Sequence, residues 1–198
     1  MPLQNLHLTA LELTHSLTQP EIDAIIIHLG NSTAETMTDY TFSHRARLIK
    51  PMISYDGAAL ALSFLPAAGE LLPCEKSESE VRTQEDDNFT YHHLRRDLFN
   101  IASKTGVSID SRYVVPSSHI TIGRFLTQDD HDTPEKMVNW IKKIEQLNAW
   151  LEEEYWPKEN GKRREDGEWI VGQEKGLDFR EGTLWYGGGN TVRIGKGF

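Results

Sequence analysis

The chain has 198 residues, 38% of them hydrophobic, and carries a formal net charge of −9. A chain of this length and composition supports one substantial core, so we expect a single domain over residues 1–198. The acidic balance excludes a protein that holds long duplex nucleic acid by neutralising many phosphates, because that mode of binding needs a broad basic surface.

The N-terminal residues lack the features of a secretion signal. Met1 to Leu13 contain no basic lead-in and no apolar run of signal length, and no later stretch has the length of a membrane-spanning helix. Cys74 is the only cysteine, which excludes an internal disulfide and a thiolate metal cluster. We therefore expect a cytoplasmic or nuclear protein with no membrane partner, and the sequence leaves its oligomeric state open.

The chain opens with a predicted strand and a predicted helix. Residues 6–13 alternate with a period of two, which is typical of a strand. Thr18 and Glu21 then have the spacing of a capping box, and an apolar stripe follows as far as Gly30. These signals predict a helix with both of its ends marked.

A hairpin and a polar loop are predicted next. The pair Asp56-Gly57 is a turn signal, and the flanking residues 48–55 and 58–65 are rich in strand formers. The acidic stretch from Glu75 to Asn88 has no periodicity, so we interpret it as an exposed loop.

Helices and strands alternate over the second half of the chain. We predict a helix over residues 89–105, a strand over 114–126 that Pro116 interrupts, and a long helix beginning at Thr133. From Trp169 onward, glycine and aromatic residues predict short strands around turns. The order of elements predicts an α+β fold.

The triplet His-x-Thr occurs twice, each time on a strand-like segment that precedes a helix. The two copies are His7-Leu8-Thr9 and His119-Ile120-Thr121. Residues two apart on a strand point the same way, so each triplet offers an imidazole and a hydroxyl from one face. If the two strands lie side by side, two histidines and two threonines meet.

Such a set suits phosphoryl transfer without a metal or another cofactor. A neutral imidazole accepts a proton from the attacking water or hydroxyl, and a protonated imidazole donates one to the departing oxygen. An unperturbed histidine pKa of about 6.5 makes both forms accessible near neutral pH. Threonine hydroxyls can donate hydrogen bonds to the phosphate oxygens. The competing interpretation is ordinary, because a single histidine on a strand is more often a hydrogen-bonded structural residue.

The residues around both triplets carry a family resemblance. His7-Leu8-Thr9-Ala10-Leu11 and His119-Ile120-Thr121-Ile122-Gly123-Arg124-Phe125 resemble the two signature motifs of the 2H phosphoesterase superfamily. More narrowly, the chain resembles fungal proteins described as RNA ligase/cyclic nucleotide phosphodiesterase domains. The resemblance implies a bilobal α+β fold in which two pseudo-symmetric lobes, with antiparallel sheets and outer helices, flank a central groove. It also implies metal-independent hydrolysis of a 2′,3′-cyclic or related ribose-linked phosphodiester, with a small nucleotide or an RNA end as substrate.

The resemblance also assigns roles to individual residues. It implies that His7 and His119 are the catalytic acid and base, in either order, and that Thr9 and Thr121 bind the phosphate. Arg124 stands where some relatives carry an arginine that contacts phosphate, although counting by two puts it on the face opposite His119. Relatives also carry a strand and a helix before their first motif, so a truncated or variant first lobe remains an open interpretation.

Other residues have weaker claims to a functional role. Trp185 and Tyr186 flank a glycine run and are candidates for stacking on a base, although core packing is the stronger interpretation. The adjacent pair His92-His93 diverges on a helix and is expected at the surface rather than around a metal ion. His15 is a candidate for supporting the site, with a simple loop position favoured.

Two other classes of function remain open. The first is a catalytically weak nucleotide- or RNA-binding module that uses the same motifs to hold a phosphate. The second is a scaffold that presents the acidic residues 75–87 to a partner, and it predicts that both motif histidines are dispensable.

Overall fold

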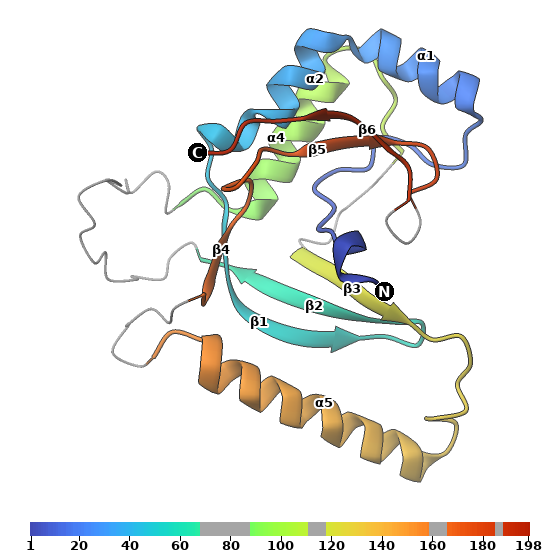
Figure 1. Cartoon of the computed structure of the whole chain (residues 1–198), viewed down its shortest axis with the longest axis vertical. Coiled ribbons are helices and arrows are strands. Elements are labelled where there is room, and N and C mark those ends of the chain that lie inside the picture. Colours follow the sequence, from blue (N-terminus) through green and yellow to red (C-terminus); the bar gives the residue numbers. More distant parts are fainter. Residues whose placement is uncertain (68–87, 111–117, 159–165, 185–187) are drawn as a thin grey trace.

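The computed structural model describes residues 1–67, 88–110, 118–158, 166–184 and 188–198 (Figure 1). Within these ranges the chain is a mixed α+β protein, as the sequence predicts. The helices and strands, in chain order, are the 3-10 turn η1 Leu3–Asn5, α1 Gln19–Leu29, α2 Asn31–Thr38, the 3-10 turn η2 Tyr40–Phe42, β1 Arg47–Tyr55, β2 Ala59–Pro66, α4 Tyr91–Ser103, β3 Ser118–Arg124, α5 Pro134–Tyr155, β4 Glu168–Ile170, β5 Asp178–Glu181 and β6 Asn190–Ile194.

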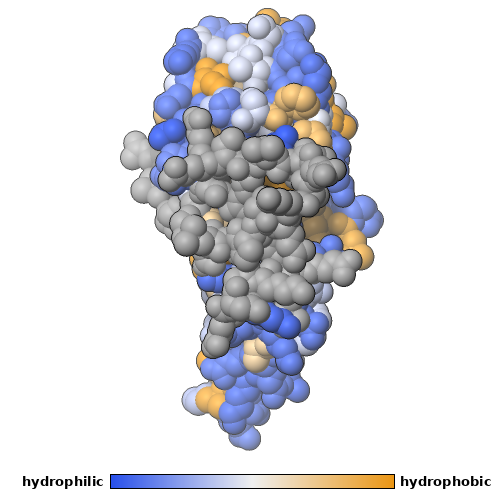
Figure 2. All heavy atoms as spheres, turned by 90° about the vertical axis from the view of Figure 1, so that its left-hand side faces the viewer, coloured by the Kyte–Doolittle hydropathy of each residue, from blue (hydrophilic) through white to orange (hydrophobic). Residues whose placement is uncertain are grey.

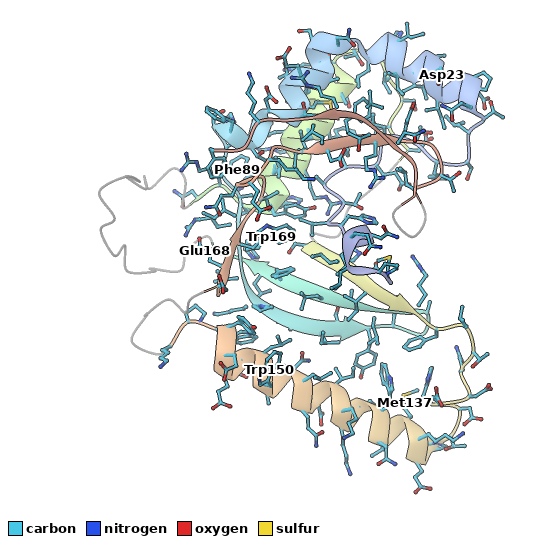
Figure 3. All side chains as sticks on the ribbon, in the orientation of Figure 1. Asp23, Phe89, Met137, Trp150, Glu168 and Trp169 are labelled. Atoms are coloured by element: carbon cyan, nitrogen blue, oxygen red, sulfur yellow. The ribbon has the colours of Figure 1, made fainter. Side chains whose placement is uncertain are left out.

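The centre of the molecule is an antiparallel sheet. Four strands pair in the order β3-β2-β1-β4, and β5 and β6 form a separate antiparallel pair. Figure 1 shows the long β1–β2 hairpin curling between α5 on one side and the layer of α1, α2, α4, β5 and β6 on the other. Along β4 the side chains alternate as the pleat requires, and Figure 3 shows Glu168 and Trp169 on opposite sides of this strand.

The helix ends follow from the predicted caps. Helix α1 begins after Thr18, which forms a capping box with Glu21, and α5 begins after Thr133, whose hydroxyl accepts a hydrogen bond from the Lys136 amide. Thr90 caps α4 in the same way, through the amide of His93. The hydroxyls of Thr90 and Thr133 thus each accept a hydrogen bond from an amide in the first turn, whereas the Thr18 hydroxyl donates to the Glu21 carboxylate.

The predicted hairpin is confirmed, and its turn is held by one carboxylate. Asp56 accepts hydrogen bonds from the amides of Ala58 and Ala59, at 2.7 Å and 2.8 Å. These two hydrogen bonds, with a smaller contribution from the nearby charge of Arg124, hold the pKa of Asp56 below its usual value. The turn fixes the register of β1 against β2, and through β2 it also fixes the position of β3.

The main core lies between the sheet and α4. Leu48 from β1 and Leu94 and Leu98 from α4 are at most 2% exposed, and Leu8 from the N-terminal segment packs against them. On the face of the molecule shown in Figure 2, most described side chains are hydrophilic, and the hydrophobic ones form small separate patches. Within the described ranges, no helix combines the length and apolar character needed to cross a lipid bilayer.

The prediction of a full strand over residues 6–13 is wrong. Only Leu8 is paired, in an isolated bridge, because the carbonyl of Thr9 accepts a side-chain hydroxyl and the carbonyl of Leu13 accepts the amide of Asp110. The segment is therefore held more by side-chain packing and loop hydrogen bonds than by a strand ladder.

Helix α2 was not predicted from the sequence. Gly30, with φ of 78°, ends α1 as expected, but the chain enters a second helix at once. The C-terminal strands stabilise the end of α2, because Arg193 donates a hydrogen bond to the Thr38 hydroxyl and the Leu177 amide donates one to the Thr38 carbonyl. Local sequence carries no sign of these distant partners.

Of the predicted loop over 75–88, only Asn88 lies within the described residues, and residues 114–117 of the predicted strand lie outside them.

Candidate functional site

The two His-x-Thr triplets lie side by side, although 112 positions separate the two histidines in the chain. Leu8 forms an antiparallel bridge with Ile120, the middle residue of the second triplet. The backbone nitrogen of Met1 also donates a hydrogen bond to the carbonyl of Ile122, at 3.0 Å. Figure 1 shows the dark-blue N-terminal segment lying along β3. The N-terminal segment therefore lies next to β3, at the edge of the four-stranded sheet.

The bridge determines which side chains are neighbours. In an antiparallel pair, the residues on either side of a bridge are opposite one another in crossed order, so His7 lies opposite Thr121 and Thr9 lies opposite His119. Leu8 packs against the main core, and the pleat therefore turns His7 and Thr9 to the other side. Opposite residues have Cβ atoms about 4.5–5.5 Å apart, and diagonal ones roughly 7–8 Å. By this geometry we infer that the four polar side chains form a compact group.

This group has an approximate two-fold symmetry. The local axis of an antiparallel pair passes between the bridged residues, here Leu8 and Ile120, and relates positions at equal steps along the two strands. The axis therefore relates His7 to His119 and Thr9 to Thr121. The two imidazoles stand on one diagonal of the group and the two hydroxyls on the other.

The ring of His7 has a defined orientation. Its Nδ1 lies 2.9 Å from the carbonyl oxygen of Asn5, and because a carbonyl only accepts, Nδ1 must carry the hydrogen. In the neutral ring, Nε2 is then the basic nitrogen. The side chain of His7 is exposed, so this nitrogen is available to a ligand. The contact with the Asn5 carbonyl cannot be predicted from the sequence, because every residue type carries the same backbone carbonyl.

The surroundings of His119 are small and polar. On β2, Ser63 lies opposite His119 and Ala61 lies opposite Thr121. Ser63 in turn shares a hydrogen bond with Ser54 of β1, with their hydroxyl oxygens 2.5 Å apart. Cross-strand partners share a face of the sheet, so these small residues form the floor beside the triplets.

The alternation of small and large side chains along β2 is the feature of the sequence that could have predicted this floor. Its residues read Ala-Leu-Ala-Leu-Ser-Phe from Ala59 to Phe64, with small side chains on the face of the triplets and large apolar ones on the other. Taken alone, this stretch predicts only a hairpin arm, and no motif marks Ser54 or Ser63.

The prediction for the face of Arg124 is wrong. The pairing of β2 with β3 runs from Ala61 opposite Thr121 to Leu60 opposite Gly123, which leaves Ile122 as an extra residue. Such a bulge changes the parity of the strand. Arg124 lies opposite Ala59, which is on the same face of β2 as Ala61, so Arg124 shares the face of Thr121. Counting by two fails here because it assumes a regular strand.

The remaining candidates are distributed as follows. Trp185 and Tyr186 lie outside the described residues. His15 is exposed, and its Nδ1 lies 3.1 Å from the hydroxyl of Ser16. His92 is exposed, whereas Nδ1 of His93 accepts a hydrogen bond from the amide of Thr90. Among the described residues, no three or more His, Cys, Asp or Glu side chains gather closely enough to hold a metal ion.

Comparison with known proteins identifies no relative. No protein-family model, no curated protein and no solved structure matches the chain.

Proposed function

We propose that this protein is a metal-independent phosphodiesterase of the 2H phosphoesterase type, acting on 2′,3′-cyclic or related ribose-linked phosphodiesters. The observation that carries the proposal is the antiparallel bridge between Leu8 and Ile120, because it brings two histidines and two threonines from distant segments into one symmetric group. A chance pair of His-x-Thr triplets has no reason to meet in register.

The symmetry of the group fits in-line displacement at phosphorus. A phosphorus atom on the local two-fold axis has one imidazole on each side. One imidazole accepts a proton from water as the water oxygen bonds to phosphorus, and the other donates a proton to the ribose oxygen whose bond to phosphorus breaks. One water is consumed, and the products are a phosphate monoester and a free ribose hydroxyl. The two histidines exchange protonation states, and solvent restores them.

The hydroxyls supply the second element of the mechanism. Thr9 and Thr121 stand on the other diagonal, where their hydroxyls donate to the two non-bridging phosphate oxygens and stabilise the charge that grows on them. Arg124 shares the face of Thr121 through the bulge at Ile122, which places it on the side of the sheet where the phosphate would bind, and a guanidinium is well suited to hold phosphate oxygens. We assign Arg124 to substrate binding.

The substrate is a small nucleotide or an RNA end rather than long RNA. The net charge of −9 disfavours neutralisation of many phosphates, and the symmetric group accommodates one phosphorus centre. The same symmetry supports the bilobal arrangement, in which the first triplet and its helices form one lobe and β3 and its neighbours form the other.

The test is turnover of 2′,3′-cyclic nucleotides in excess chelator. The wild type is expected to form a nucleoside monophosphate, and His7→Ala and His119→Ala are each expected to lower kcat by about 10²- to 10⁴-fold. Each variant should still bind a nucleoside monophosphate in calorimetry, because the threonines and Arg124 remain. His92→Ala is the control, since His92 is exposed on α4 and takes no part in the group.

Two outcomes contradict this function. A folded wild type that binds nucleotides but hydrolyses neither cyclic mononucleotides nor RNA ends with a cyclic phosphate favours the binding module. A wild type whose activity survives both histidine substitutions shows that the chemistry lies elsewhere.

A further inference from the structure

Tyr91 links the main core to the first triplet. It is the first residue of α4, it is 3% exposed, and its ring belongs to the core cluster that includes Leu48, Leu94 and Leu98. Thr90 caps the helix directly before it, so the backbone of Tyr91 is fixed by a hydrogen-bonded helix start. Both ends of the residue are thus constrained, its backbone by the helix and its ring by packing.

The hydroxyl of Tyr91 reaches the backbone of the first triplet. It donates a hydrogen bond of 2.7 Å to the carbonyl oxygen of Thr9, 82 positions away in the chain. The carbonyl of a regular strand residue accepts a neighbouring amide, but the N-terminal segment makes only the single bridge at Leu8. The Tyr91 hydroxyl therefore supplies to the Thr9 carbonyl the hydrogen bond that a backbone amide supplies in a regular strand pair.

We propose that Tyr91 is a positioning residue for the catalytic group. Its hydroxyl fixes the carbonyl of Thr9, and thereby sets how the Thr9 hydroxyl and the His7 ring face His119 and Thr121. This inference rests on the proposed phosphodiesterase function, and it adds a residue that lies on a helix outside both motifs. Such positioning matters because a displacement of about 1 Å in a catalytic group can cost on the order of 10²-fold in rate.

Tyr40 provides a matched control within the same core. It also packs against the core cluster, and its hydroxyl donates a 3.0 Å hydrogen bond, in this case to the carboxylate of Asp97. Tyr40→Phe and Tyr91→Phe each remove one phenol hydrogen bond and leave the ring in place. Only Tyr91→Phe releases the first triplet.

The first measurement is steady-state hydrolysis of a 2′,3′-cyclic nucleotide. Tyr91→Phe is expected to lower kcat at least about tenfold with KM within about threefold of the wild type, whereas Tyr40→Phe should leave kcat within about twofold. Thermal unfolding of both variants checks that each is folded and that any loss of stability is of similar size. Equal kcat values for folded Tyr91→Phe and Tyr40→Phe overturn the positioning role.

The second measurement does not depend on turnover. Amide hydrogen exchange at residues 8–10 is expected to be at least about tenfold faster in Tyr91→Phe and unchanged in Tyr40→Phe, because local opening depends on the few contacts that close the segment. Unchanged exchange in Tyr91→Phe overturns the inference. A wild type without turnover instead overturns the proposed function, and the exchange result then still decides whether Tyr91 holds the triplet.

Discussion

The two segments that carry the triplets are built in opposite ways. The second triplet lies within β3, which pairs with β2 over six residue pairs and is part of a four-stranded sheet. The first lies in an N-terminal segment that makes a single bridge and is also held by the Met1–Ile122 hydrogen bond, the Tyr91 hydroxyl and the packing of Leu8. Two triplets with the same proposed role are therefore anchored differently, and we expect a change in the core to disturb the first triplet more than the second.

The largest expected effect is on stability, when the core that supports the N-terminal segment loses packing. Leu94 is 0% exposed in the core against which Leu8 packs, so Leu94→Ala is expected to lower the free energy of unfolding by about 2–5 kcal/mol. Leu8 is half-buried, and Leu8→Ala should cost less, about 1–2 kcal/mol. Urea denaturation measures both. A larger loss for Leu8→Ala contradicts a segment held from one side by the core.

The threonines test whether the two segments act as equals. Thr9→Val and Thr121→Val each remove one hydroxyl donor with little change in shape, and each is expected to lower kcat about 100-fold. The two effects should agree within about threefold, because the local two-fold axis gives the hydroxyls equivalent positions. Steady-state kinetics on a cyclic nucleotide decides this. A tenfold difference between the variants means that the symmetry is not shared by the bound phosphate.

Arg124 tests a feature of β3 that is not part of the symmetric pair of triplets. Arg124→Met keeps the aliphatic stem and removes the charge, so it is expected to raise KM about tenfold with kcat nearly unchanged, since the proposed contact with phosphate is the same before and during reaction. Arg96→Met, on the exposed side of α4, is the control. An unchanged KM in Arg124→Met shows that the bulge at Ile122 does not serve the substrate.

The smallest effect concerns the turn that positions β2 and β3. The pKa of Asp56 is lowered in the folded protein by hydrogen bonds from the Ala58 and Ala59 amides, so its stabilising effect is complete above the ordinary carboxyl pKa and disappears as pH falls through the lowered value. Asp56→Ala is therefore expected to melt at a lower temperature than the wild type at neutral pH, with the gap closing in acid. Asp130→Ala, at an exposed loop position, should show no such closing gap. A gap that is constant with pH contradicts the turn contribution.

Local sequence signals predicted elements where the determining contacts are local. Thr18 with Glu21, Asp56 with Gly57, and Thr133 act within one turn of chain, and all three mark boundaries that the structure has. The failures lie where distant residues decide. The end of helix α2 is stabilised by Arg193, which lies at the other end of the chain. The N-terminal segment has contacts with α4 in place of the hydrogen bonds of a regular strand pair.

The sequence by itself determined the residue types of the candidate site and the period-two spacing within each triplet, because that spacing follows from the covalent geometry of an extended chain. Only the tertiary structure decided that Leu8 meets Ile120, that Arg124 shares the face of Thr121, and that Tyr91 holds Thr9. Strand pairing and bulges depend on the whole set of packed neighbours, and no local stretch of sequence contains that set.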